Sequence, residues 1–334
     1  MATLPIIDIA PYLAPSSTPE SRHDTAQLLH RACTDTGFFY LTGHGITSAT
    51  TDRILDLARR FFLESSDAEK ALIQRKDAGL DDGDGGRGYQ KIGENVTGGR
   101  RDFHEAVDLY APVQEEHGPP YKLLMGKNLW PQRPQELKPA FENYIKELKQ
   151  VGTAVVKAMG DALGLLATQS DEGADVFVEA TGNSFWVMRM IGYPGLPGTN
   201  AQGDLNGDVE QFSCGAHTDY GCVTLLLADQ TPNSLQVQAK SGDWMSANPI
   251  PGAFIVNIGD MMERWTNGIW KSTNHRVIHR GENYRVSVPF FFEPNFDAVV
   301  RPLQKCVRET GGEAKYTEVV YGDFLTRKIA GNFY

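Results

Sequence analysis

The order of apolar and polar residues changes near Gly182, and the two parts of the chain predict different structure. Before Gly182, apolar residues recur at helical spacing in several stretches, and the longest stripe predicts a helix over about 138–165. After Gly182, short apolar runs are separated by Gly, Pro and Asn clusters, as strands are separated by turns. Short strands at near-regular intervals are typical of a double-sheet jelly roll.

These patterns predict a mainly β protein with flanking helices, in which a double-stranded β-helix (jelly-roll) core is buttressed by the long helix. The expected strands are 4–9, 37–41, 184–193, 223–228, 234–239, 254–258, 274–279 and 284–292. Helices are expected at 21–36, from 48, at 67–74, 138–165 and 316–329. We expect residues 1–110 to form an α/β region packed on the core and residues 111–334 to form the core itself, as one integrated unit.

A segment rich in Gly and Asp, residues 81–87, interrupts the first half. Together with Gly88 it contains the pattern G-x-G-x-x-G, which in a dinucleotide site must follow a strand and open a helix. No strand pattern precedes it and no helical pattern follows it, so we expect a flexible connector instead.

Composition restricts the partners of the protein. The net charge of −10 over 334 residues argues against binding nucleic acid or anionic membranes, since Lys and Arg drive both interactions. The four cysteines have no paired spacing, and the N-terminus has neither the basic flank nor the apolar run of a signal peptide. No run of about 20 apolar residues predicts a transmembrane helix. We expect a cytoplasmic protein, monomeric by default, that acts on a small molecule.

Three residues, His217, Asp219 and His275, can provide a metal site. On a strand, His217 and Asp219 point to the same face because they are two residues apart, so both can reach one ion. His275 can bring a second imidazole from a distant strand. Two His and one carboxylate on one side of a metal leave the opposite side open, as in non-haem Fe(II) oxygenases.

Arg285 and Ser287 add a candidate anion site ten residues beyond His275. The Arg285 guanidinium offers a planar, permanently charged fork to a carboxylate, and the Ser287 hydroxyl lies on the same strand face. A metal site next to a carboxylate-binding site is typical of enzymes that use a metal ion together with a carboxylate ligand.

The chain resembles the Fe(II)- and 2-oxoglutarate-dependent dioxygenases of the isopenicillin N synthase-like type over nearly its whole length. The N-terminal resemblance rests on residues 5–8, 37–46, 61–62 and 69–70. The remaining resemblance rests on residues 215–221, 257–260, 272–277, 284–287 and 291–295.

The resemblance implies roles for these residues. His217, Asp219 and His275 become the Fe(II) ligands, while Arg285, Ser287 and Tyr193 hold the distal carboxylate of 2-oxoglutarate. The implied cofactors are Fe(II), 2-oxoglutarate and O2, with ascorbate as a stimulant. The implied reaction hydroxylates, desaturates or cyclises a small molecule through a ferryl intermediate and releases succinate and CO2.

Other side chains near these motifs have alternative roles. His279 shares a strand face with His275 and competes as the third ligand on spacing alone, and the resemblance favours His275. Asp260 could ligate a metal but is better explained as a turn residue. Candidates for the wall of the substrate pocket are Tyr89, Phe103, His104, Tyr220, Trp265 and Phe292.

Several alternative functions remain open at this stage. A same-fold oxidase could use the Arg-x-Ser pair without 2-oxoglutarate, and an ethylene-forming type of enzyme would fragment 2-oxoglutarate itself. A zinc hydrolase could use the same three ligands but has no need of the carboxylate anchor. An inactive binding protein would be expected to have lost at least one ligand, and none is missing.

Overall fold

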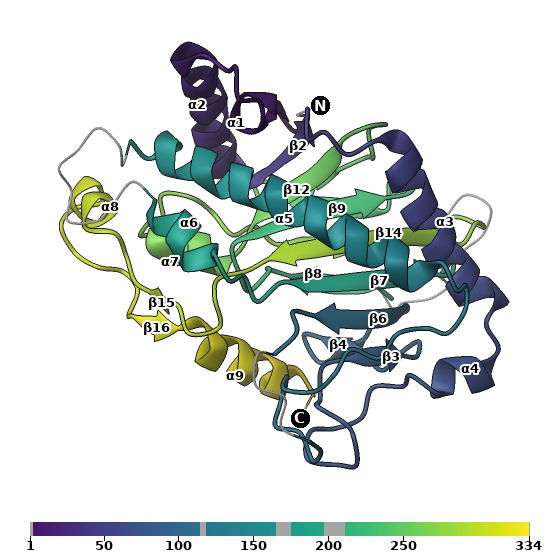
Figure 1. The fold of residues 1–334 in the computed structure, drawn as a ribbon. Coiled ribbons are helices and arrows are strands. Elements are labelled where there is room, and N and C mark those ends of the chain that lie inside the picture. The colour runs from purple at the N-terminus through teal and green to yellow at the C-terminus, as the bar shows by residue number, and fades with distance from the viewer. Residues whose placement is uncertain (1–2, 114–117, 165–174, 197–210, 334) are drawn as a thin grey trace.

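The structure is a computed structural model that describes residues 3–113, 118–164, 175–196 and 211–333 (Figure 1). Its helices are α1 (Ala10–Leu13), α2 (Pro19–Asp35), α3 (Ser48–Glu64), α4 (Asp67–Ala71), α5 (Leu137–Ala162), α6 (Val176–Thr181), α7 (Asp260–Trp265), α8 (Gln304–Glu309) and α9 (Tyr321–Phe333). The first strands are β1 (Ile6–Asp8), β2 (Phe38–Thr42), β3 (Gly88–Gln90), β4 (Val96–Thr97), β5 (Arg100–Arg101), β6 (Glu105–Tyr110), β7 (Val187–Tyr193) and β8 (Cys214–His217). The others are β9 (Val223–Ala228), β10 (Leu235–Gln238), β11 (Trp244–Ser246), β12 (Phe254–Ile258), β13 (His275–Val277), β14 (Arg285–Phe292), β15 (Val299–Val300) and β16 (Val319–Val320).

Two sheets form the centre of the protein. The larger sheet has the strand order β1-β2-β12-β9-β14-β7-β6-β3, and the smaller has the order β11-β10-β13-β8. Alternate residues of the larger sheet, among them Phe38 and Tyr193, pack with Val237 and Val277 of the smaller sheet in one buried cluster. The two sheets therefore enclose an apolar interior, as the jelly-roll expectation requires.

The helices cover the other face of the larger sheet. In Figure 1, α5 lies across this sheet, over β9 and β14, with α2 and α3 beside it. The buried residues of α5 include Val155 and Met159. They belong to the same hydrophobic cluster as Leu225 and Val288 of the sheet, whose side chains point toward the helix. The 26-residue helix thus seals the face that the smaller sheet leaves uncovered.

The N-terminal part of the chain lies within the larger sheet. Strands β1 and β2 form one edge of that sheet, and β3 and β6 form the other. Strand β2 pairs with β12, and β6 pairs with β7, so strands from before residue 110 flank the four central strands from after it in one sheet. Residues 1–110 thus contribute strands to the larger sheet itself and do not form a separate layer.

The segment 81–87 is not the flexible connector that its glycines predict. Residues 83–87 are buried, and Arg87 lies 2% exposed in an ion pair with Asp84. The Arg87 guanidinium also donates to the carbonyl oxygens of Leu124, at 2.7 Å, and Ala111, at 2.8 Å. A buried charge is tolerated only when it is paired and hydrogen-bonded, so these bonds hold the loop in place.

Within the described residues, no helix is both long enough and apolar enough to span a membrane.

The close packing of α5 on the sheet predicts that position 152 has no room for a side chain larger than that of glycine. A Cβ atom at this position would lie 2.6 Å from the ring of Phe292, which is 1% exposed. We expect Gly152→Val to lower the free energy of unfolding by about 3 kcal/mol, because the added methyl groups overpack a closed core. Thr153→Ala, on the exposed side of the same helix, is the control and should change it by less than about 0.5 kcal/mol. Denaturant unfolding measures both, and equal effects would contradict this packing.

Candidate metal centre and co-substrate site

His217, Asp219 and His275 come together at one end of the smaller sheet. His217 ends β8 and His275 begins β13, and the antiparallel pairing of these strands sets the two residues opposite each other. Asp219 follows β8 by two residues, and its Oδ1 lies 3.8 Å from His217 Nε2 and 3.7 Å from His275 Nε2. One donor atom from each residue lies within 4.8 Å of the other two, so the three can surround a single ion.

Hydrogen bonds to the backbone orient both imidazoles. His217 Nδ1 lies 2.8 Å from the carbonyl oxygen of Gly215, and His275 Nδ1 lies 3.1 Å from that of Thr273. A carbonyl oxygen only accepts, so each Nδ1 carries the proton. The Nε2 lone pair of each ring is thereby left for a metal, in the way that metal-ligating histidines are usually arranged.

The Asp219 carboxylate is held from the larger sheet. Its Oδ2 accepts hydrogen bonds from Asn257 Nδ2, at 2.7 Å, and from the Thr224 hydroxyl. These bonds leave Oδ1 directed at the two imidazoles. Burial alone would raise the pKa of Asp219, but His275, His217 and the two hydrogen bonds hold that pKa below its usual value. The carboxylate is therefore ionised, as a metal ligand must be.

Sequence reasoning missed Asn257 and Thr224 as supports of this site. They are direct cross-strand neighbours on β12 and β9. Each interrupts an otherwise apolar strand, and both side chains are buried, at 3% and 5% exposed. Two polar residues inside apolar strands were the available signal, because buried polar groups need partners.

A second site lies inside the sheets, around Arg285. Arg285 pairs with Tyr193 across β14 and β7, and its guanidinium carbon lies 4.7 Å from the centre of the Tyr193 ring. Ser287 is two residues further along β14 and therefore shares the same strand face. Arg285 is 2% exposed, yet its Nε and Nη1 have no hydrogen-bond partner among the described residues. A buried guanidinium with unpaired donors fits a carboxylate ligand such as that of 2-oxoglutarate.

A cavity of about 440 Å³ borders the metal donors. It lies between the β4 hairpin, β7, β8 and the helix α9. Two of the six side chains expected in the substrate wall line it, namely His104 and Tyr220. The ionisable residues that also line it are Asp102, Asp108, Arg189, Glu293 and Lys328. The cavity therefore combines these acidic and basic side chains with aromatic ones such as Tyr110, Tyr220 and Phe291.

Four expected wall residues, Tyr89, Phe103, Trp265 and Phe292, do not line this cavity. Tyr89 donates to Glu105 at 2.6 Å, Trp265 packs against Phe177, and Phe292 packs against α5. Large aromatic side chains are most stable in a closed core, which explains the placement of Tyr89, Trp265 and Phe292, whereas Phe103 is only half-buried.

His279, the alternative third ligand, lies outside the metal group. It is 1% exposed, and its Nε2 lies 2.7 Å from the carbonyl oxygen of Asn283. Asp260, which was expected to be a turn residue, instead begins α7, and Ser272 donates to it.

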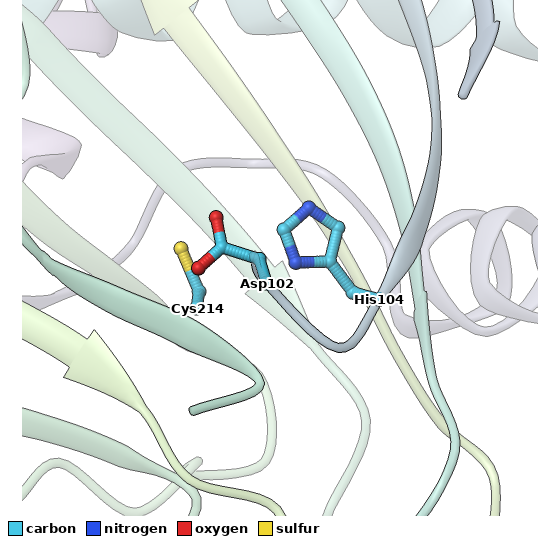
Figure 2. Close-up of side chains that lie close together, drawn as sticks. All are labelled: Asp102, His104 and Cys214. Atoms are coloured by element: carbon cyan, nitrogen blue, oxygen red, sulfur yellow. The ribbon is translucent and has the colours of Figure 1, made fainter. Parts of the chain in front are cut away.

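Asp102, His104 and Cys214 form a second group of donor side chains beside the cavity (Figure 2). Asp102 accepts hydrogen bonds from the Gly215 amide, at 2.8 Å, and from the Thr97 hydroxyl, at 2.7 Å. His104 Nδ1 lies 2.6 Å from the carbonyl oxygen of Ser213. These bonds hold the start of β8, and the Gly215 carbonyl in turn orients His217. The group therefore positions the neighbouring metal donors.

The hydrogen bond from Asn257 gives a prediction for metal affinity. Asn257→Ala removes a donor from Asp219 Oδ2 and frees the carboxylate to turn. We expect Fe(II) or Mn(II) to bind about 10- to 100-fold more weakly, the usual effect of losing such an outer partner. Anaerobic metal titration measures this, and Asn248→Ala on the exposed surface is the matched control. Unchanged affinity in a folded Asn257→Ala protein would contradict the role.

Family models match both halves of the chain. A model described as the N-terminal region of non-haem dioxygenases in morphine synthesis matches residues 4–133. A model of the 2OG-Fe(II) oxygenase superfamily matches residues 186–294, the part that holds the metal donors and Arg285.

Solved structures share the fold over almost the whole chain. A full-length Neurospora crassa protein in complex with alpha-KG aligns with a TM-score of 0.81 and 24% identity, over 98% of this chain and 96% of that one. A putative 2OG-Fe(II) oxygenase family protein of Caulobacter crescentus aligns with a TM-score of 0.78 and 26% identity, over 99% of both chains.

Relatives of known name are similar over the full length. Homoarginine-6-hydroxylase of Glycine max is 41% identical over 338 residues, which cover 99% of this chain and 98% of that protein. Homoarginine-6-hydroxylase of Oryza sativa subsp. japonica is 40% identical over 337 residues, which cover 99% and 97%. Since these matches agree with the metal donors and the buried arginine, the chain belongs to the 2OG-Fe(II) oxygenase superfamily and is an Fe(II)- and 2-oxoglutarate-dependent dioxygenase that acts on small molecules.

Proposed function

We propose that this oxygenase hydroxylates an amino acid with a cationic side chain, and that homoarginine is its substrate or a close analogue of it. The charged cavity beside the metal donors carries the proposal. Lys328, which is partly exposed, can meet a carboxylate, while a carboxylate that lines the same space can meet a cation. The names of the relatives that are about 40% identical over the whole chain support the same class.

We propose that His217, Asp219 and His275 hold Fe(II), and that Arg285, Ser287 and Tyr193 hold 2-oxoglutarate. The free Nε2 atoms and the ionised Asp219 suit the first role, and the unpaired donors of Arg285 suit the second. When bound, Fe(II) and 2-oxoglutarate supply the oxidising chemistry, which consumes O2 and releases succinate and CO2.

The residues of the chain contribute orientation and exclusion of water. His217, Asp219 and His275 would hold the metal, and because His217 and Asp219 also line the cavity, a bound substrate would lie next to these ligands. The Arg285 site, buried between the sheets, fixes the far end of the keto acid. The cavity then holds one C–H bond of the substrate against the open side, which selects the carbon that is oxidised.

The proposal also includes the domain organisation and the oligomeric state of the protein. We expect residues 1–110 and 111–334 to act as one unit, because strands of both complete the larger sheet. We also expect α5 to buttress the jelly-roll core, and the monomer to be the active form.

Homoarginine turnover tests the proposal directly. Purified protein with Fe(II), ascorbate, O2 and labelled 2-oxoglutarate should release labelled CO2 in proportion to added homoarginine. The product should gain one oxygen atom, whereas desaturation would remove two hydrogens and cyclisation would also leave the product without added oxygen. Release of ethylene, or turnover that does not require 2-oxoglutarate, would favour the alternative reactions. If homoarginine, arginine and lysine all fail to stimulate CO2 release, the proposed substrate class is wrong.

The role of Arg285 predicts a selective loss of co-substrate affinity. Arg285→Met removes the buried guanidinium and should weaken 2-oxoglutarate binding about 100-fold, because one charge of a buried pair is left without its partner. Anaerobic calorimetry of the Mn(II)-loaded protein measures the Kd. Arg301→Met, which changes a side chain that is 66% exposed, is the control and should leave the Kd unchanged. Equal Kd values in both variants would remove Arg285 from the co-substrate site.

A further inference from the structure

Glu293 is a buried carboxylate at the border of the cavity. It follows β14 directly and is 4% exposed. One of its oxygens, Oε2, accepts a hydrogen bond from the Cys222 amide at 3.2 Å. This amide belongs to the turn between Asp219 and β9, so the carboxylate lies beside the metal donors and not at the outer mouth of the cavity.

The backbone next to Glu293 has a glycine at position 221, which leaves room for the Glu293 carboxylate. A Cβ atom on Gly221 would lie 1.0 Å from Glu293 Oε2, so only glycine leaves room for the carboxylate at this turn. Gly221 is two residues from Asp219. The close approach fixes Glu293 on the same turn that carries a metal donor.

Glu293 lacks a positive partner. Among the described residues it forms no ion pair, while Arg189 pairs with Asp108 at 2.9 Å and Lys328 lies 4.0 Å from Asp260. The two cations that line the cavity are thus each directed at another carboxylate.

The surroundings of Glu293 destabilise its ionised form relative to its protonated form. Burial raises the pKa of Glu293 to about 8, and the nearby Asp219 and Asp260 carboxylates add to the rise. A buried acid with acidic neighbours and no counter-ion is costly, and a bound cation relieves that cost.

The other carboxylates of the cavity are already engaged. Both oxygens of Asp102 accept hydrogen bonds, from the Gly215 amide and the Thr97 hydroxyl. Asp108 meets Arg189 and accepts from Gln90 at 2.6 Å. Glu293 is thus the lining carboxylate, outside the metal donors, that is left for a ligand.

We propose that Glu293 binds the cationic group of the substrate and places the carbon next to that group at the metal site. This inference rests on the proposed function. In homoarginine, carbon 6 bears the guanidino group, so a cation held beside the metal donors brings that carbon to the oxidising centre. The opposite end of the amino acid then extends toward α9, where Lys328 lines the cavity. The charge of the side chain, and not its length alone, selects the substrate.

The test compares homoarginine with homocitrulline, its neutral analogue of nearly the same shape. The wild-type protein, loaded with Fe(II) and 2-oxoglutarate, should favour homoarginine in kcat/KM by about 100-fold or more, because only a cationic compound favours the ionised form of Glu293 and pairs with it. Glu293→Gln keeps the shape and removes the charge. It should lower kcat/KM for homoarginine about 100-fold, change that for homocitrulline by less than about 3-fold, and leave the Kd of 2-oxoglutarate unchanged.

Glu142→Gln, on an exposed face of α5, is the matched control and should match the wild type on both compounds. Equal loss on both compounds in Glu293→Gln would reduce Glu293 to a structural residue and overturn the proposal. If that variant does not fold, anaerobic binding of the two compounds to the wild type decides, and equal affinities overturn it. A wild type that oxidises homoarginine without preferring it overturns the role of Glu293 alone. A wild type that oxidises no cationic amino acid overturns the proposed function as well.

Discussion

The pairing of β8 with β13 is the interaction on which the metal centre depends. Its register sets His217 opposite His275, so a backbone ladder fixes the distance between two donors that lie far apart in the sequence. The third donor, Asp219, comes from the turn after β8 and is tied to the larger sheet by Asn257. The site therefore exists only when the two sheets are packed in one arrangement, and the apolar interior between them maintains that arrangement.

The grouping of the candidate metal and anion residues could be predicted because it follows from the local geometry of a strand. Residues two apart on a strand share a face, which groups His217 with Asp219 and Arg285 with Ser287 without knowledge of the fold. The strands predicted at 223–228 and 254–258 coincide with β9 and β12, since both are continuous apolar runs with clear turn residues around them. The long helix was also evident, as its apolar stripe extends over most of α5.

The structural features that could not be predicted from the sequence depend on contacts between distant segments. Strands β3 to β6 lie in a stretch rich in Gly, Asp and Arg, and the place of β6 in the sheet comes from pairing with β7 and not from strand propensity. Aromatic residues such as Trp265 could not be assigned to core or cavity, because the direction of each depends on how the elements pack. The support of Asp219 by Asn257 and Thr224 likewise required the register of two strands.

The unpaired Arg285 guanidinium has a consequence for the lifetime of the protein. If Arg285 holds 2-oxoglutarate as proposed, the protein without this ligand keeps a buried guanidinium whose Nε and Nη1 have no hydrogen-bond partner among the described residues, and this lowers the free energy of unfolding. Binding of 2-oxoglutarate to the folded chain alone shifts the folding equilibrium toward the native state, by an amount that grows with its concentration. Such binding would lower the fraction of unfolded chain, which is the form that proteases attack. The same arginine would then couple the concentration of the keto acid to the stability of the protein as well as to its turnover.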